Sequence, residues 1–222
     1  MNTNDAKVKK SLKVSFKEGV FASAMTGFTQ EYFTPFLLLL GGTVRHVGFL
    51  SAFPNLIASL VQLKSADIVE RINSRKKIIT IFVFLQSMMF IPMIAVALFK
   101  QHSPTIFITI VVLFTCCGAL ANPAWGSLMS DLVHKDKRGQ YFGWRNRTLG
   151  FVTAGAMVMA GFFLYLMKKI NVFGGFALLF SFAFIWRMLS WHFLNKIHEP
   201  RLHNNGNNHF SLLQFLRRLK ES

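Results

Sequence analysis

The sequence predicts an all-α fold, a polytopic membrane protein with six transmembrane helices, and two observations support this prediction. Hydrophobic residues make up 52% of the 222, and they gather in six stretches that each reach the roughly 20 residues needed to cross a bilayer. The formal net charge is nevertheless +16, and the basic residues gather in alternate gaps between these stretches. A soluble domain rarely combines these properties, whereas positive charge retains the cytoplasmic loops of membrane proteins.

Each apolar stretch is predicted to be a helix, because in hydrocarbon a single segment satisfies its backbone hydrogen bonds only as a helix. A polar, basic arm over residues 1–16 precedes the first stretch and carries no signal-peptide cleavage site. The predicted spans cover residues 17–40, 47–64, 78–99, 105–129, 147–167 and 173–194.

A polar segment, residues 195–222, follows the last predicted span. Its first part, residues 199–209, is a linker rich in Asn with Pro and Gly. The second part, residues 210–220, predicts a short amphipathic helix at the membrane surface. Its apolar face consists of Leu212, Phe215, Leu216 and Leu219.

Charge predicts the orientation. The arm, the second-to-third gap, the fourth-to-fifth gap and the tail are all basic, and the opposite gaps hold few positive charges: Arg45, Lys100, Lys168 and Lys169. By the positive-inside rule both termini are cytoplasmic. We therefore expect an integral protein of the plasma (inner) membrane, with the lipid bilayer as a partner.

Other functional classes find little support. The basic residues flank apolar runs and form no separate basic domain, so no nucleic-acid partner is expected. The only two cysteines, Cys116 and Cys117, are adjacent within an apolar stretch, which predicts no disulfide framework. Neither a metal-ligand spacing nor a phosphate-binding loop nor a Ser/His/Asp set occurs. We therefore expect no cofactor, no metal and no enzymatic activity.

Polar residues interrupt the predicted spans. Glu31 lies near the middle of the first span, where a carboxylate is costly unless it faces protein or water. On a continuous helix it would share one face with five neighbours. These are Ser23, Thr26, Gly27, Gln30 and Thr34.

The second and fourth spans also carry polar residues: Ser51, Asn55, Ser59 and Gln62 in one, and Asn122 beside Pro123 in the other. Two interpretations stay open, namely hydrogen bonds between helices or a substrate or proton pathway. For Glu31 the pathway is favoured, because a charge costs more than an amide. Pro35 and Pro123 lie at similar depths in the first and fourth spans, which is typical of repeats around a central site.

The second and fourth loops combine acidic and basic residues. In the second, Asp67 and Glu70 are placed to pair with Arg71 and Arg75, and in the fourth Asp131 is placed to pair with Arg138. Such pairs serve either as topological charge alone or as cytoplasmic latches that differ between conformations, because surface pairs contribute only about 0–1 kcal/mol. The predicted gating set is Asp67, Glu70, Arg71, Arg75, Asp131, Arg138, Gly139, Arg145 and Arg147.

At these residues the chain resembles the N-terminal half of a major facilitator superfamily transporter. Its most specific stretch, NPAWGSLMSDLV…RGQYFGWRNR, resembles a bacterial subgroup of that superfamily. The family's second loop follows Gly-x-x-x-Asp-x-x-Gly-Arg-Lys. Here Glu70-Arg71 and Arg75-Lys76 match its charged core, with Ser74 in place of the second Gly and one extra residue.

The resemblance implies a bundle of two inverted three-helix repeats, a second such bundle, alternating access and a central cavity lined by the first and fourth helices. Gln30, Glu31, Asn122 and Trp125 are then cavity candidates, and the full predicted pathway also includes Thr34 and Asn55. The fifth span lacks the Gly-Pro motif of the drug/proton antiporter branch, which weakens an efflux assignment.

The family chain continues into six further spans, whereas this one stops after the sixth. We therefore expect a truncated or split transporter that needs a missing C-terminal half or a second copy. The predicted function is transport of a small solute, coupled to protons by symport or antiport. The alternative is a truncated, non-transporting membrane protein that acts as a sensor or interaction scaffold.

Overall fold

The computed structural model describes residues 3–65, 68, 72, 74–100 and 103–199, with side chains described from residue 8 onward. All secondary structure in these residues is helical, which confirms the predicted all-α class for this part of the chain. The predicted amphipathic segment over 210–220 lies outside the described residues. The helices are α1 (Thr3–Gly27), η1 (Gln30–Tyr32), α2 (Phe33–Leu39), α3 (Val44–Gln62), α5 (Arg75–Met88), α6 (Phe90–Leu98), α7 (Pro104–Leu132), η2 (Lys135–Lys137), α8 (Arg138–Met167) and α9 (Val172–Leu194).

Five helical segments in the described chain are long and apolar enough to cross a membrane. They are Val44–Gln62, Arg75–Leu98, Pro104–Leu132, Lys135–Met167 and Val172–Leu194. Each overlaps one of the last five predicted spans. The first predicted span, residues 17–40, differs because it is divided among α1, η1 and α2.

Proline explains where the first span is interrupted. Pro35 is the third residue of α2, where its missing N–H costs no helical hydrogen bond, whereas in a continuous helix it would clash with the carbonyl one turn earlier. α1 ends at Gly27, and the Thr29 hydroxyl donates to the Met25 carbonyl at 2.8 Å. The expectation that the polar residues from Ser23 to Thr34 share one continuous helical face is therefore wrong. Pro123, by contrast, lies inside the unbroken helix α7.

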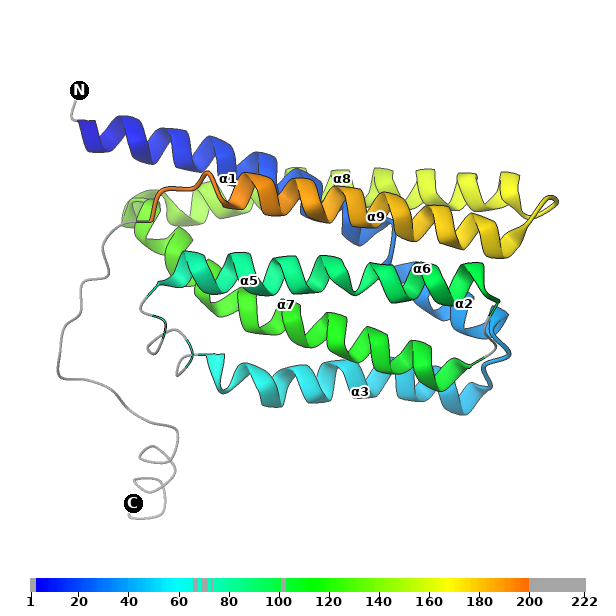
Figure 1. Cartoon of the computed structure of the whole chain (residues 1–222). Coiled ribbons are helices and arrows are strands. Elements are labelled where there is room, and N and C mark those ends of the chain that lie inside the picture. Colours follow the sequence, from blue (N-terminus) through cyan, green and yellow to red (C-terminus); the bar gives the residue numbers. More distant parts are fainter. Residues whose placement is uncertain (1–2, 66–67, 69–71, 73, 101–102, 200–222) are drawn as a thin grey trace, which may run out of the picture.

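The helices run roughly parallel and form two packed groups (Figure 1). In one group α1 packs against α8 and α9, and in the other α7 packs against α3 and α5. Contacts of α5 and α6 with α9 join the groups. α2 completes the first segment by packing against α3 and α7.

Aromatic packing fixes α2 in the bundle. The Phe36 ring is fully buried, with its centroid 4.9 Å from Phe107 on α7 and 5.2 Å from Phe180 on α9. Rings at these separations attract one another beyond the burial of their area. The short helix after the break is therefore a packed part of the core.

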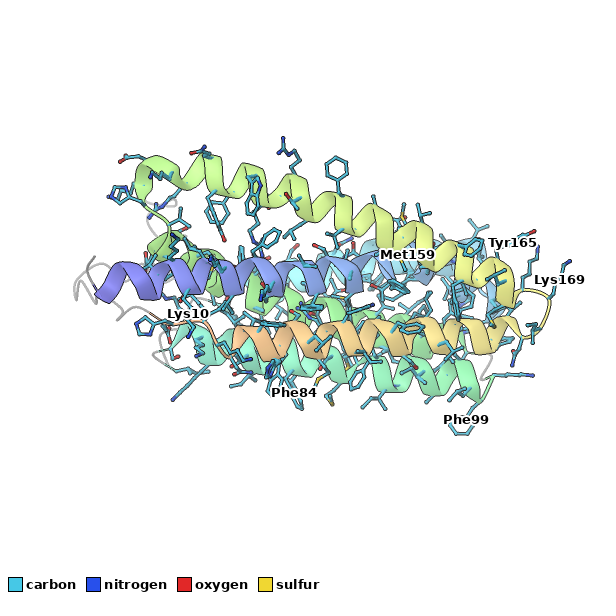
Figure 2. All side chains as sticks on the ribbon, turned by 90° about the horizontal axis from the view of Figure 1, so that it is seen from above. Lys10, Phe84, Phe99, Met159, Tyr165 and Lys169 are labelled. Atoms are coloured by element: carbon cyan, nitrogen blue, oxygen red, sulfur yellow. The ribbon has the colours of Figure 1, made fainter. Side chains whose placement is uncertain are left out.

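Large apolar side chains cover the outside of the bundle. Figure 2 shows Tyr165 on α8 and Phe84 on α5 near the edge of the bundle. Met159 and Tyr165 are 64% and 70% exposed. An apolar surface of this kind suits lipid rather than water.

The start of α1 and the end of α9 lie at the same end of the bundle (Figure 1). The His198 backbone N–H donates to the Ser11 hydroxyl at 3.2 Å and ties them together. Lys10 and Lys169 lie at opposite ends (Figure 2). The start of α5 and the loop between α7 and α8 lie at the same end of the bundle as the start of α1 (Figure 1).

Candidate functional site

A cavity of about 540 Å³ lies between the broken first segment and helices α3, α5 and α7. Many of its lining residues are exposed, so it opens on one face of the bundle. Its polar lining consists of Gln30, Thr34, Ser51, Asn55, Ser59, Gln62, Gln86, Thr115 and Asn122. All of these are amides or hydroxyls, and none of the described residues that line the cavity carries a charge.

The polar residues of α3 hydrogen-bond within their own helix. The Asn55 amide donates to the Ser51 carbonyl at 3.1 Å, and the Ser59 hydroxyl donates to the Asn55 carbonyl at 2.8 Å. These bonds do not join α3 to another helix, as the alternative of interhelical hydrogen bonding requires. The Asn55 side-chain oxygen is not used by this intrahelical bond and keeps its capacity as an acceptor.

The structure brings together four of the six predicted pathway residues. Gln30, Thr34, Asn55 and Asn122 all line the cavity, although they come from η1, α2, α3 and α7. Glu31 lies exposed on η1 and is not among the lining residues.

Trp125, the sixth predicted pathway residue, belongs to another cluster. Its ring lies 4.5 Å from the Arg145 guanidinium, a cation–π contact, and the Phe142 ring is 6.4 Å away. Trp125 does not line the cavity.

The innermost polar side chain of the cavity is Gln86 on α5, which is buried. Its amide nitrogen donates to the Phe114 carbonyl on α7 at 3.1 Å, and its oxygen accepts a hydrogen bond from Arg187 on α9. Gly118 makes room for this amide, because a Cβ there would lie 2.8 Å from the Gln86 nitrogen. Gln86 thus connects the cavity to the interior of the bundle.

Behind Gln86 lies an ionic cluster formed by Glu18 on α1, Arg145 on α8 and Arg187 on α9. These residues are 5%, 7% and 8% exposed. The Glu18 carboxylate lies 3.5 Å from an Arg145 nitrogen and accepts a hydrogen bond from the Ser190 hydroxyl at 3.0 Å. Arg187 is also 3.5 Å from that hydroxyl. One cluster therefore holds α1 together with α8 and α9, which are distant from it in sequence.

Sequence reasoning missed Glu18 and Arg187. Arg187 was recognisable, because a guanidinium inside the predicted span 173–194 is itself a functional signal. Glu18 stands at the start of the predicted span 17–40, where it reads as an interfacial charge. Arg145 was predicted as a cytoplasmic gating residue, and the structure places it buried in this cluster.

A second polar cluster lies at the end of the bundle where α1 begins. Arg75 at the start of α5 is buried and donates to the Asp131 carboxylate on α7 at 2.6 Å. Glu199, after α9, accepts from the Arg75 backbone N–H and from the Ser74 hydroxyl, each at 2.7 Å. We call Arg75, Asp131 and Glu199 the latch cluster, since it joins α5, α7 and the chain after α9.

The predicted partner of Asp131 was wrong. Asp131 pairs with Arg75 rather than with Arg138. Arg138 instead donates to the Ser130 and Val133 carbonyls, at 2.6 and 3.2 Å, where the last carbonyls of α7 need partners.

The remaining predicted gating residues fall in two classes. Gly139 and Arg147 are exposed on α8. Asp67, Glu70 and Arg71 lie outside the described residues.

The comparisons with known proteins bear on the whole chain. The family model described as Major Facilitator Superfamily matches residues 16–221. No curated protein and no solved structure gives a significant match. The match confirms the resemblance stated from the sequence, and proteins of this family transport solutes across membranes.

Proposed function

Because this chain belongs to the Major Facilitator Superfamily, we propose that it forms one half of a secondary transporter that moves a small solute by alternating access. The observation that carries this proposal is the cavity of about 540 Å³ lined by uncharged amides and hydroxyls. Concave sites with a few convergent polar groups are where small ligands bind. Gln30, Thr34, Asn55 and Asn122 would contact the solute.

The packing supports six spans arranged as two inverted repeats. The first segment packs on α8 and α9, the fifth and sixth segments, while α7, the fourth, packs on α3 and α5, the second and third. The third and sixth segments pack on each other. Exchanging segments one to three with four to six reproduces this pattern, as repeat symmetry requires.

The open cavity supports a partner bundle. Exposed amides and hydroxyls on a membrane-spanning face are unfavourable against lipid, and a second bundle would cover them. A separate six-helix half or a second copy of this chain would supply the other cavity wall. The basic end that carries the latch cluster would face the cytoplasm, by the positive-inside rule.

Proton coupling is assigned to Glu31 rather than to Glu18. Glu18 lies between two guanidinium groups, and protonating it would leave two buried cations without a counter-charge. Glu31 is exposed and directly follows the cavity residue Gln30 in η1. It is therefore the carboxylate placed to exchange a proton during a transport cycle.

The test is an uptake assay in the native cell. The gene is replaced on the chromosome by Asn55→Ala or Asn122→Ala, and uptake of a defined mixture of labelled sugars, organic acids and amines is measured. We expect uptake of at least one class to fall in both variants. The matched control is Asn195→Ala, an exposed amide that bonds its own helix away from the cavity. Unchanged uptake of every class in both cavity variants would reject the proposal.

A further inference from the structure

The ionic cluster behind the cavity is not neutral. One carboxylate, Glu18, lies with two guanidinium groups, Arg145 and Arg187, which leaves one positive charge in excess. The third buried arginine, Arg75, differs because two carboxylates, Asp131 and Glu199, approach it. A buried charge without a counter-charge is costly, so a bound anion near the cluster would stabilise it.

Arg145 and Arg187 each keep a buried Nε without a hydrogen-bond partner among the described residues, and of the two it is Arg187 that contacts the cavity residue Gln86. It donates to the Gln86 oxygen and lies 3.5 Å from the Ser190 hydroxyl. Its Nε is buried and has no hydrogen-bond partner in the described part of the chain. The Arg187 guanidinium thus retains one N–H group without an acceptor.

The Gln86 amide links the Arg187 guanidinium to the cavity wall by hydrogen bonding. Arg187 only donates hydrogen bonds, so it must face the oxygen of the Gln86 amide, which turns the nitrogen toward α7. That nitrogen uses one hydrogen for the Phe114 carbonyl, its second hydrogen has no acceptor among the described residues, and the Gln86 side chain lines the cavity. An amide polarised by a guanidinium in a low-dielectric interior is a strengthened donor.

We propose that the inner wall of the cavity at Gln86 binds an anionic group of the solute, a carboxylate or a phosphate. The surrounding amides and hydroxyls would hold the polar remainder of the same molecule. This inference rests on the proposed transport function and narrows it to organic anions. The charge behind Gln86 is the specific reason, because none of the described lining residues carries a charge of its own.

The experiment measures the potential at the wall with charged thiol reagents. In a Cys116→Ser, Cys117→Ser background, a reporter cysteine replaces Thr115, which lines the cavity beside Phe114. The purified chain in phosphatidylcholine nanodiscs is treated with anionic sulfonatoethyl and cationic trimethylammonioethyl methanethiosulfonate. We expect the ratio of anionic to cationic rates, relative to a free thiol, to be raised about fivefold or more.

Three variants test whether the charge behind Gln86 causes the raised rate ratio. Gln86→Glu keeps a partner for Arg187 but neutralises the excess charge, so the ratio should fall to that of the free thiol or below. Arg187→Gln should do the same and leaves a balanced Glu18–Arg145 pair. The matched control is Lys169→Gln, which removes an exposed charge from the distant end of the bundle and should leave the ratio unchanged.

Each alternative outcome is decisive. If the rate ratio in the parent equals that of a free thiol, or favours the cationic reagent, the anion site is overturned. The proposed cavity is not affected by that result. A raised ratio that disappears when phosphatidylglycerol is added assigns the site to a lipid headgroup instead of a solute. A second reporter, Ser59→Cys on α3, tests the cavity itself. Absence of labelling at both reporters by both reagents means that the cavity is not water-filled, and this rejects the proposed transport function.

Discussion

The Glu18 carboxylate on α1 and the Arg145 guanidinium on α8 lie 3.5 Å apart, and both are buried. The Ser190 hydroxyl connects Arg187 to this carboxylate, because it accepts from Arg187 and donates to Glu18. The pair joins the first segment of the chain to the fifth. Helix α9 lies next to both at this point. Because the pair is buried, it helps to determine how the helices assemble.

Glu18→Gln is expected to destabilise the bundle by about 3–5 kcal/mol, because it leaves two buried guanidinium groups without a carboxylate. Arg187→Gln should destabilise the bundle much less, because the Glu18 carboxylate and the Arg145 guanidinium that remain have opposite charges. Unfolding of the purified variants by added SDS, in one detergent, measures the difference. Equal losses in the two variants would contradict the charge count.

Gly27 and Gly155 form a matched pair for testing the packing of α1 on α8. A Cβ on Gly27 would lie 2.4 Å from the Thr153 backbone oxygen, whereas one on Gly155 meets nothing within 4 Å. Gly27→Ala should therefore force the helices apart and cost about 1–3 kcal/mol. Gly155→Ala should be neutral or slightly stabilising, because alanine is the better helix former. The same SDS titration checks both, and a neutral Gly27→Ala would show that α1 does not pack closely on α8.

The sequence allowed the helical class and most of the cavity wall to be predicted, because both depend on local patterns. Asn55 and Asn122 are polar residues in apolar stretches, and such residues line cavities whatever the details of packing. The break at Phe28–Thr29 was not predicted, although Pro35 was noted, because a proline marks a kink without fixing which residue ends the helix.

The ionic contacts were beyond prediction, because they depend on which helices meet. Asp131 is closer in sequence to Arg138 than to Arg75, yet the packing of α5 on α7 brings Arg75 to it. In the same way, Glu18 and Arg187 belong to opposite ends of the described chain. Only the packing of α1 on α9 makes them neighbours.

Asp131→Asn is expected to loosen the latch cluster. It removes the charge that accepts from the buried Arg75, and a hydrogen bond to a charged group contributes about 1.5–3 kcal/mol. Amide hydrogen exchange at the start of α5 should become faster as a result. The control is Asp136→Asn on η2, whose carboxylate is exposed and lies 3.3 Å from an exposed histidine, His134. Faster exchange in both variants, or in neither, would mean that Asp131 does not hold α5.

Glu31→Gln tests the coupling assignment against its neighbour Gln30. If Glu31 exchanges the coupling proton, the amide variant should lose the dependence of uptake on an imposed pH gradient, because an amide cannot carry a proton. Gln30→Ala should instead raise the KM for the solute and keep that dependence, since Gln30 lines the cavity and does not titrate. Initial uptake rates in the native cell, with and without a protonophore and for the solute class found with the Asn55 and Asn122 variants, provide the measurement. Uptake by Glu31→Gln that still responds to the gradient would assign coupling to another group and leave the cavity assignment intact.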